Sequence, residues 1–410
     1  MDKLTIRDID VSGKRVLVRV DFNVPLDEKT GTITDDSRIR ATLPTIKYLI
    51  DRGARVILCS HLGRPGGKVV DKLRLTVLAQ RLSQILGKQV GVTKDSIGSE
   101  TRKSVASLKA GDVILLENLR FHSAEEMDSP LFARGLARLA DIYVNDAFGT
   151  SHRSHASIEK VADYLPSVAG LLLEKELETL GSILENPAHP FGGLLGGAKV
   201  SDKVGMLENI MNKVDFLLIG GGMAATFLKA KSYEIGLSLI EADRLDTAVG
   251  LMEKAARNGV NLLLPVDVVV VYEIGAEAKG KIVSIENISP HQRIVDIGPQ
   301  TIKNFQEELQ KCRTVFWNGP MGIYEIAQFT EGTQTMARLL ASLEAATIIG
   351  GGSSAEIVTK MGLADKMTFV STGGGATLRF LGGQTLPGVE ALLDKDSLAA
   401  GKLKGLTTLA

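Results

Sequence analysis

Arginine and histidine side chains gather in the first half of the chain, where they could bind an anion. They sit in or beside the loops that follow four successive apolar runs: Arg19, Arg38, Arg64, Arg120, Arg153, His61, His122, His152 and His155. A guanidinium forms paired hydrogen bonds with carboxylate or phosphate, and imidazole adds a short-range donor. The alternative is a set of unrelated solvated surface residues. A metal site at His152 and His155 lacks a third ligand at suitable spacing.

In the second half of the chain, glycine clusters follow the apolar runs in place of the arginines and histidines. Triplets at 220–222, 350–352 and 373–375 each follow an apolar run. Glycine permits close backbone approach, so N–H groups at the start of a following helix can face phosphate. A single triplet is more typical of a tight turn, whereas three in one half favour a nucleotide. The phosphate-binding GxxxxGK[ST] and dinucleotide-binding GxGxxG fingerprints are missing from the sequence.

Two lysines lie beside a further glycine turn, at 196–203. Lys199 and Lys203 are four residues apart, so a helix beginning here would place both ammonium groups on one face. They could hold the transferring phosphate of a nucleotide, or be two exposed lysines after a turn. The sequence has no GxSxG or HExxH motif, so serine-hydrolase and zinc-protease chemistry lack support.

These residues are positioned by short apolar runs that alternate with longer helical patterns. The runs cover 15–20, 55–59, 112–116 and 141–144, then 216–219, 261–264 with 266–271, 314–317, 347–349 and 368–370. Their Val, Ile and Leu content is typical of parallel strands buried on both faces. Ligands of open α/β sheets bind beyond the carboxyl ends of the strands. We therefore predict an α/β protein with two doubly wound parallel sheets, each facing its own ligand.

A leucine-striped segment separates the two halves. Leu173, Leu177, Leu180 and Leu184 recur at helical spacing, and Pro187 and Pro190 follow. We predict a first domain over 1–170, an interdomain helix over 171–186 and a second domain over 187–389.

Length and composition restrict the class of protein. The chain has 410 residues with 44% hydrophobic and 23% charged, and 48 Lys and Arg balance 48 Asp and Glu, which argues against nucleic-acid binding. The first 170 residues carry a surplus of five positive charges, which suits an anionic ligand. Cys59 and Cys312 are too far apart in sequence to suggest a disulfide framework. With no apolar leader or membrane-length run, we expect a cytoplasmic soluble protein.

Eight motifs, in order along nearly the whole chain, resemble those of the phosphoglycerate kinase family. RVDFNVP at 19–25, SHLGRP at 60–65, ENLRFH at 117–122 and DAFGTSHR at 146–153 are similar to its substrate-side motifs. GGAKVSDK at 196–203, GGGMA at 220–224, WNGPMG at 317–322 and STGGGA at 371–376 are similar to its nucleotide-side motifs. The length and DIGPQT at 296–301 resemble the shorter archaeal members.

The resemblance implies two Rossmann-like domains joined by a long helix, with a cleft between them and a C-terminal tail, about 390–410, that returns to the first domain. It implies that the first domain binds 3-phosphoglycerate or 1,3-bisphosphoglycerate, and the second ATP or ADP with Mg2+. Carried over by position, the substrate-binding residues are Asp21, Phe22, Asn23, Arg38, His61, Leu62, Gly63, Arg64, Arg120 and Arg153.

On the nucleotide side, the same resemblance points to Lys199, Lys203, Gly221, Asn318, Glu325, Gly351, Gly352, Ser353 and Ser354. It makes Glu325 the ribose-binding carboxylate and assigns catalysis to Arg38, Lys199, Lys203 and Gly374. Most bacterial and eukaryotic members have Gly-Gly-Asp-Thr where this chain has Gly351 to Ser354. Without that Asp we expect no protein carboxylate on the metal, with Mg2+ held mainly by phosphate oxygens and water, and Ser353 able to contribute its hydroxyl.

The expected activity is reversible, direct in-line phosphoryl transfer in a closed cleft, a step of glycolysis and gluconeogenesis. Such a phosphotransferase, with a carboxyl group as acceptor, needs positioning and charge neutralisation more than a protein nucleophile. We expect a monomer or homodimer, with no nucleic-acid or membrane partner. Two alternatives remain: an NAD-dependent dehydrogenase, suggested only by glycine-rich turns, and a non-catalytic anion-binding protein.

Overall fold

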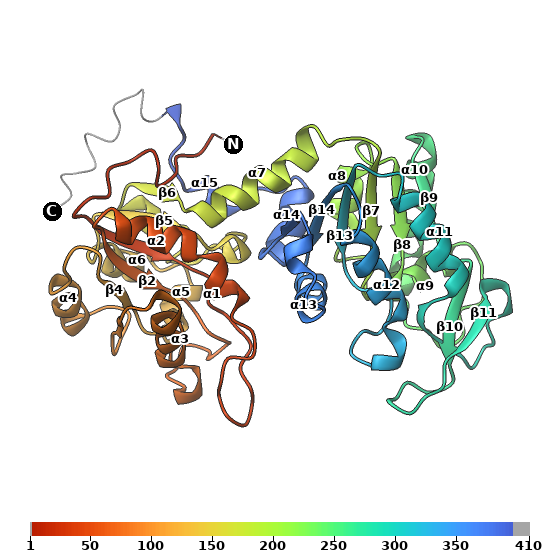
Figure 1. The fold of residues 1–410 in the computed structure, drawn as a ribbon, viewed down its shortest axis with the longest axis horizontal. Helices are drawn as coiled ribbons and strands as arrows, with labels where there is room; N and C mark the ends of the chain where they lie inside the picture. Colours follow the sequence, from red (N-terminus) through yellow and green to blue (C-terminus); the bar gives the residue numbers. More distant parts are fainter. Residues whose placement is uncertain (1, 397–410) are drawn as a thin grey trace. The chain divides into compact units, whose positions relative to one another are not determined.

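The computed structural model describes residues 2–396, which fall into two compact units (Figure 1). Unit 1 contains the described residues up to Glu178 together with those from Thr385 onward, and unit 2 is Thr179–Gln384. The division lies inside helix α7 (Leu171–Glu185). The assignment of one ligand to each domain stays a prediction.

Unit 1 is built on a six-stranded sheet in which every neighbouring pair is parallel. Its order is β3 (Val90–Val92), β4 (Val113–Leu115), β2 (Arg55–Cys59), β1 (Arg15–Arg19), β5 (Ile142–Asn145) and β6 (Ser167–Ala169). The α-helices are α1 (Ser37–Ala41), α2 (Leu43–Asp51), α3 (Thr76–Leu86), α4 (Ser99–Ala106), α5 (Ser123–Glu126), α6 (Pro130–Ala137) and α15 (Pro387–Glu390). Short 3-10 turns are η1 (Asp71–Leu73), η2 (Leu119–Phe121), η3 (Phe148–Thr150) and η4 (Lys160–Asp163).

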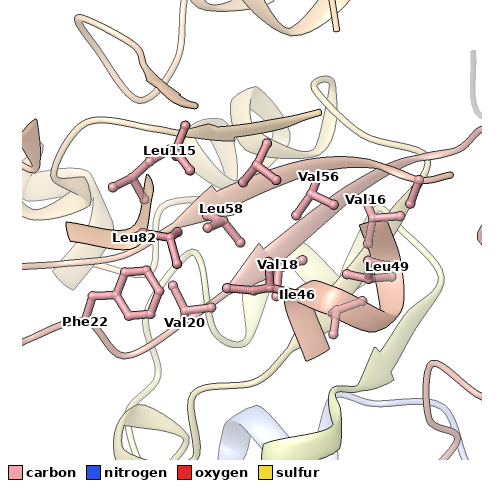
Figure 2. Close-up of a cluster of buried hydrophobic side chains, with 14 of the residues drawn as sticks. Val16, Val18, Val20, Phe22, Ile46, Leu49, Val56, Leu58, Leu82 and Leu115 are labelled. Atoms are coloured by element: carbon pink, nitrogen blue, oxygen red, sulfur yellow. The ribbon is translucent and has the colours of Figure 1, made fainter. Parts of the chain in front are cut away.

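The apolar runs of unit 1 are buried on both faces of the sheet. Side chains two apart in a strand share a face, and Val16 and Val18 of β1 lie in one cluster with Ile46 and Leu49 of α2 (Figure 2). Leu17, between the two valines, points to the opposite face and is also fully buried. This two-sided burial explains why the run shows no polar alternation.

The chain returns to unit 1 after unit 2 is complete. Leu4 N donates to Leu393 O over 2.8 Å, and Leu393 N donates to Ser167 O over 2.9 Å. Asn145 Nδ2 donates to Gly388 O over 2.8 Å. The described part of the expected returning tail, residues 390–396, thus bonds to unit 1, and residues 397–410 lie outside the described residues.

Helix α7 starts on polar groups supplied by unit 1. Asp146 Oδ1 accepts from Leu172 N over 2.9 Å and from Leu173 N over 3.3 Å, while Thr45 Oγ1 accepts from Leu171 N over 2.9 Å. These bonds satisfy N–H groups that lack partners within the helix. Because Asp146 is fully buried, its pKa is raised to about 7.

Unit 2 also contains a six-stranded parallel sheet. Its order is β15 (Phe369–Val370), β14 (Ala346–Gly350), β13 (Thr314–Asn318), β7 (Phe191–Leu195), β8 (Phe216–Ile219) and β9 (Asn261–Leu263). The α-helices are α8 (Val204–Ile210), α9 (Gly221–Ala230), α10 (Leu245–Arg257), α11 (Pro299–Leu309), α12 (Glu331–Leu340), α13 (Gly352–Lys360) and α14 (Gly375–Leu381). Its 3-10 turns are η5 (Ala242–Arg244), η6 (Ile285–Asn287), η7 (Ala327–Phe329) and η8 (Ala364–Lys366).

The valine-rich run at 266–271 does not belong to that parallel sheet, so the prediction of its place was wrong. Strand β10 (Asp267–Val271) lies between β11 (Lys281–Ser284) and β12 (Arg293–Ile297) in a separate antiparallel sheet. Antiparallel sheets can leave one face in water, and Ile282 of β11 is exposed. Periodicity within β10 alone cannot distinguish the two kinds of strand because β10 is itself largely buried.

None of the helices in the described part of the chain combines the length and hydropathy needed to cross a bilayer.

Truncating a central core side chain of unit 1 should cost far more stability than truncating an exposed one. Leu58 on β2 is fully buried in the cluster of Figure 2, so Leu58→Ala should lower the free energy of unfolding by about 2–5 kcal/mol. Leu131 on α6 is 82% exposed, so Leu131→Ala should change it by less than about 0.5 kcal/mol. Urea unfolding followed by far-UV circular dichroism measures both. Equal losses would contradict the burial pattern.

Candidate functional site

In unit 1, Asp21 and Arg38 form an ion pair at the end of β1. Asp21 follows the strand and its side chain is 9% exposed, while Arg38 comes from α1 and is 32% exposed. The bond joins Arg38 Nη1 to Asp21 Oδ2. The carboxylate thereby restrains the guanidinium and leaves its other donors for an anion.

The loop after β2 is fixed by neighbouring strand ends. Asn23 Oδ1 accepts from Gly63 N over 2.8 Å, and Arg120 Nη1 donates to Gly63 O over 2.9 Å. Gly63 has φ +65°, and an added Cβ would lie 2.9 Å from Leu73 Cδ2. Asn118 Nδ2 donates to Leu62 O over 2.9 Å. Three of the four segments that were predicted to bind one anion, 19–25, 60–65 and 117–122, are thus tied to one another.

His61 is a neutral ring surrounded by arginines. Its pKa lies well below the usual value, first because the ring is buried, and then because of the positive charges of Arg19, Arg120, Arg153 and Arg38. An uncharged imidazole carries one N–H donor. The structure therefore supports His61 as a hydrogen-bond donor and argues against it as a cation.

Two predicted substrate residues differ from the simple expectation that their side chains bind the ligand. Phe22 and Leu62 have side chains buried in the apolar core (Phe22 in Figure 2), so only their main chains could meet a ligand. Phe22 N already donates to Ser60 Oγ over 3.0 Å. Arg64 is exposed, whereas Arg153 is half-buried.

In unit 2, glycine loops pack directly against one another at the carboxyl edge of the sheet. Gly197 N donates to Pro320 O over 2.8 Å, and Gly221 N donates to Met321 O over 3.0 Å. A Cβ added to Gly221 would lie 2.5 Å from Gly197 N, and Gly221 has φ +65°. No other residue fits this position without moving the backbone.

Lys203, Asn318 and Gly351 form the polar centre of these loops. Lys203 Nζ donates to Asn318 Oδ1 over 2.5 Å. Asn318 Nδ2 is buried without a hydrogen-bond partner among the described residues, and a Cβ on Gly351 would lie 2.7 Å from it. Burial lowers the pKa of Lys203 to about 8. An ammonium and an unpaired amide N–H together suit an anionic oxygen acceptor.

Lys199 and Lys203 do not share one helix face, as they would if a helix began at this turn. Helix α8 begins at Val204 with Lys203 as its N-cap residue, and Lys199 lies exposed in the preceding loop. Glu241 holds this loop because its Oε2 accepts from Val200 N over 2.6 Å and from Ser201 N over 3.0 Å. A distant carboxylate thus holds N–H groups that would lie in the first turn of a helix beginning at Lys199.

The 351–354 segment forms the start of α13. No side chain of the described residues caps this helix, and Gly351 has φ +92°. Ser354 is buried and its Oγ accepts from Gly319 N over 2.7 Å, so its hydroxyl holds the Asn318 loop. Ser353 is half-buried and Gly352 exposed. Gly374, with φ +53°, precedes α14.

A largely apolar cavity of about 550 Å³ lies beside the glycine loops. Gly221 and Glu325 both line it, with Leu237, Leu239 and Met321 among the apolar residues. Such a cavity with few polar groups is typical of a small-molecule site. It brings together the residues predicted for the nucleoside.

Sequence reasoning missed two kinds of residue in these sites. Asp296 lies in the cavity wall, where its Oδ2 accepts from Gly332 N over 2.9 Å and burial raises its pKa to about 7. Ser157 and Glu125 lie buried beneath the His61 loop and bond to each other, and Ser157 also bonds to Arg19. The only available signal was a charged residue inside an apolar run, which applies to Asp296 within 294–297 and not to Ser157 or Glu125.

The family model for phosphoglycerate kinase matches residues 6–384. A phosphoglycerate kinase from Moorella thermoacetica is 54% identical over 395 residues, 96% of this chain and 100% of the relative. One from Dictyoglomus turgidum is 56% identical over 393 residues, 96% of this chain and 98% of the relative.

Solved structures agree with this similarity. The phosphoglycerate kinase of Coxiella burnetii has a TM-score of 0.84 and 41% identity, covering 95% of this chain and 98% of its own. The enzyme of Pyrococcus horikoshii has a TM-score of 0.84 and 33% identity, with the same coverage. The likeness to archaeal members in particular stays a prediction.

Binding of an anionic ligand beside Lys203 should weaken as pH rises through about 8, because the free ammonium loses its proton there. An anion favours the charged form, so binding should also take up protons near this pH. Calorimetry with ADP and Mg2+ between about pH 7 and 9, in buffers of different ionisation enthalpy, measures both effects. Lys203→Arg keeps its charge and should bind with a flatter pH dependence. Identical profiles for the two proteins would show that Lys203 does not titrate in this range.

Proposed function

The chain belongs to the phosphoglycerate kinase family, and we propose that it transfers a phosphoryl group reversibly between 1,3-bisphosphoglycerate and ADP, giving 3-phosphoglycerate and ATP. This is a phosphotransferase reaction with a carboxyl group as acceptor, and it belongs to glycolysis and gluconeogenesis. Action in the cytoplasm and a monomeric or homodimeric state stay predictions.

The observation that carries the proposal is the group formed by Lys203, Asn318 and Gly351. It offers an ammonium and a buried amide N–H without a partner among the described residues, beside the backbone of a glycine loop. We assign it to the phosphates of the nucleotide. Gly221 and Glu325 line the neighbouring cavity, which we assign to the nucleoside.

On the other side we assign the glycerate to Asp21 and Asn23 with the basic patch of unit 1, defined here as Arg38, His61, Arg64, Arg120 and Arg153. Four arginine charges act on buried His61, so the patch supplies positive charge together with a neutral donor. This combination suits a ligand with both a carboxylate and a phosphate.

The chemical step is proposed as direct in-line transfer. Arg38 neutralises charge from the acyl-phosphate side, Lys199 and Lys203 do so from the nucleotide side, and Gly374 supplies a backbone donor. Most of the catalysis of such transfers comes from neutralising the charge on the three equatorial oxygens of the phosphoryl group and from aligning the attacking and leaving oxygens. The step requires both ligands to meet with water excluded, because water would hydrolyse the acyl phosphate.

Magnesium is proposed to enter with the nucleotide as part of the substrate. No group of three His, Cys, Asp or Glu side chains within residues 2–396 is arranged to hold a metal ion. Ser353 is half-buried at the start of α13 and could add its hydroxyl, whereas the hydroxyl of Ser354 is occupied by Gly319 N. Magnesium keeps water and phosphate ligands readily, so this donor set suits it.

The experiment that tests the proposal is a coupled assay with 3-phosphoglycerate, ATP and Mg2+. Turnover that requires all three supports it. Binding of 3-phosphoglycerate by calorimetry without turnover would indicate a non-catalytic anion-binding protein. A nicotinamide absorbance change without coupling enzymes would indicate a dehydrogenase.

Replacing an arginine of the basic patch by lysine should weaken the binding of 3-phosphoglycerate and leave the binding of ATP unchanged. Arg153→Lys keeps the positive charge but cannot form the paired hydrogen bonds of a guanidinium. Each lost charged hydrogen bond should reduce the binding free energy by about 1.5–3 kcal/mol, which is about one to two decades in affinity. Calorimetry with each ligand measures this, with exposed Arg102→Lys on α4 as the matched control. Weaker ATP binding with unchanged 3-phosphoglycerate binding would reverse the assignment of ligands to the two domains.

A further inference from the structure

A continuous chain of buried polar side chains runs beneath the basic patch, from Glu125 to His61. Glu125 and Ser157 are fully buried, Arg19 is 1% exposed and His61 is 3% exposed. They come from α5, the segment after η3, the end of β1 and the loop after β2. Buried polar groups on four separate segments persist only when they satisfy one another.

The direction of each hydrogen bond in this chain can be assigned. Arg19 Nε donates to Ser157 Oγ over 2.9 Å, because a guanidinium has no acceptor. Ser157 Oγ then donates its single proton to Glu125 Oε1 over 2.6 Å, and Ser157 N donates to Glu125 Oε2 over 3.0 Å. The carboxylate of Glu125 therefore sets the orientation of the Ser157 hydroxyl, and the hydroxyl oxygen accepts the hydrogen bond from Arg19.

The other end of Arg19 determines the tautomer of His61. Arg19 Nη2 lies 3.1 Å from His61 Nδ1. Because the guanidinium can only donate, Nδ1 must be the acceptor, so the proton of the neutral ring is on Nε2. Nε2 makes no hydrogen bond to any of the described residues, so this donor remains available to a ligand.

We propose that Glu125 and Ser157 are positioning residues that act through Arg19 to hold His61 as its Nε2–H tautomer, ready to donate to the anionic substrate. The inference rests on the proposed function, because it takes the glycerate to be the ligand of His61. Phosphate and carboxylate oxygens are acceptors. The opposite tautomer would present a lone pair to them and would leave Arg19 Nη2 without its acceptor.

The buried environment makes this arrangement specific. Burial raises the pKa of Glu125, while Arg19 and the two bonds from Ser157 act in the opposite direction. Nearby polar groups also face the chain: His155 Nδ1 lies 3.9 Å from Glu125 Oε1, and Tyr143 Oη donates to Ser157 O over 2.7 Å. Removing one hydroxyl therefore breaks the connection between carboxylate and guanidinium without deleting either charge.

The test combines histidine NMR with steady-state kinetics on Ser157→Ala. In protein labelled with 15N-histidine, long-range 1H–15N spectra should show His61 as Nε2–H in the wild type, assigned by the loss of its signals in His61→Gln. In Ser157→Ala the His61 ring should shift toward a tautomer mixture. The KM for 3-phosphoglycerate should rise by up to about tenfold, while the KM for ATP stays unchanged.

Three further variants distinguish a loss of His61 positioning from a general disturbance of the structure. Ser157→Thr keeps the hydroxyl and should restore both the spectrum and the KM. Glu125→Gln keeps the shape and one acceptor, so it should give a smaller change in the same direction, and it serves if Ser157→Ala does not fold. Ser167→Ala removes another buried hydroxyl, which bonds to Leu165 O over 2.8 Å, and should change neither readout.

An unchanged Nε2–H signal in Ser157→Ala and Glu125→Gln, with the KM for 3-phosphoglycerate within twofold of the wild type, would overturn the proposal. Equal changes in Ser167→Ala would also overturn it. A wild-type protein without turnover would overturn the proposed function, whereas a tautomer shift confined to the Ser157 and Glu125 variants would still support their link to His61.

Discussion

Parallel pairing makes every strand of a sheet end at the same edge, and both candidate ligand sites follow from this constraint. In unit 1 it brings Asp21, His61 and Arg120 together from β1, β2 and β4. In unit 2 it gathers residues that lie at or just after the ends of β7, β8, β13 and β14, namely Gly197, Gly221, Asn318 and Gly351. Residues far apart in the sequence therefore meet because their strands are paired in register.

The two candidate anion sites are built in different ways. Unit 1 uses charged side chains whose positions depend on a buried polar chain, because a guanidinium such as that of Arg19 is stable inside only when its donors are satisfied. In unit 2 the side chains of Lys203 and Asn318 lie among backbone segments that approach one another closely, which restricts positions such as Gly221 to glycine. The first arrangement is sensitive to loss of a single hydroxyl, and the second to gain of a single methyl group.

The sequence predicted the strongly apolar strands and the loops after them because apolar runs and punctuating glycines are local signals. It missed β3, β6, β7, β11 and β12, which are short or contain glycine or charged residues. It failed where the outcome depended on a distant partner. Glu241 accepts hydrogen bonds from the N–H groups of Val200 and Ser201, so the helix after this turn begins only at Val204. The valines of β10 resemble a parallel strand, and only their neighbours β11 and β12 make the sheet antiparallel. Ser157 and Glu125 carry no motif of their own, since their role depends on reaching Arg19 in space.

The discontinuous path of unit 1 has a consequence for synthesis on the ribosome. Its last described segment, from Thr385 onward, is translated only after the whole of unit 2 has been made. Until then Leu4 N and Ser167 O lack Leu393, their backbone hydrogen-bond partner. Unit 2 is continuous in sequence, so its contacts are complete as soon as Gln384 leaves the exit tunnel. The half of the protein that emerges first therefore acquires its last backbone partners only at the end of synthesis.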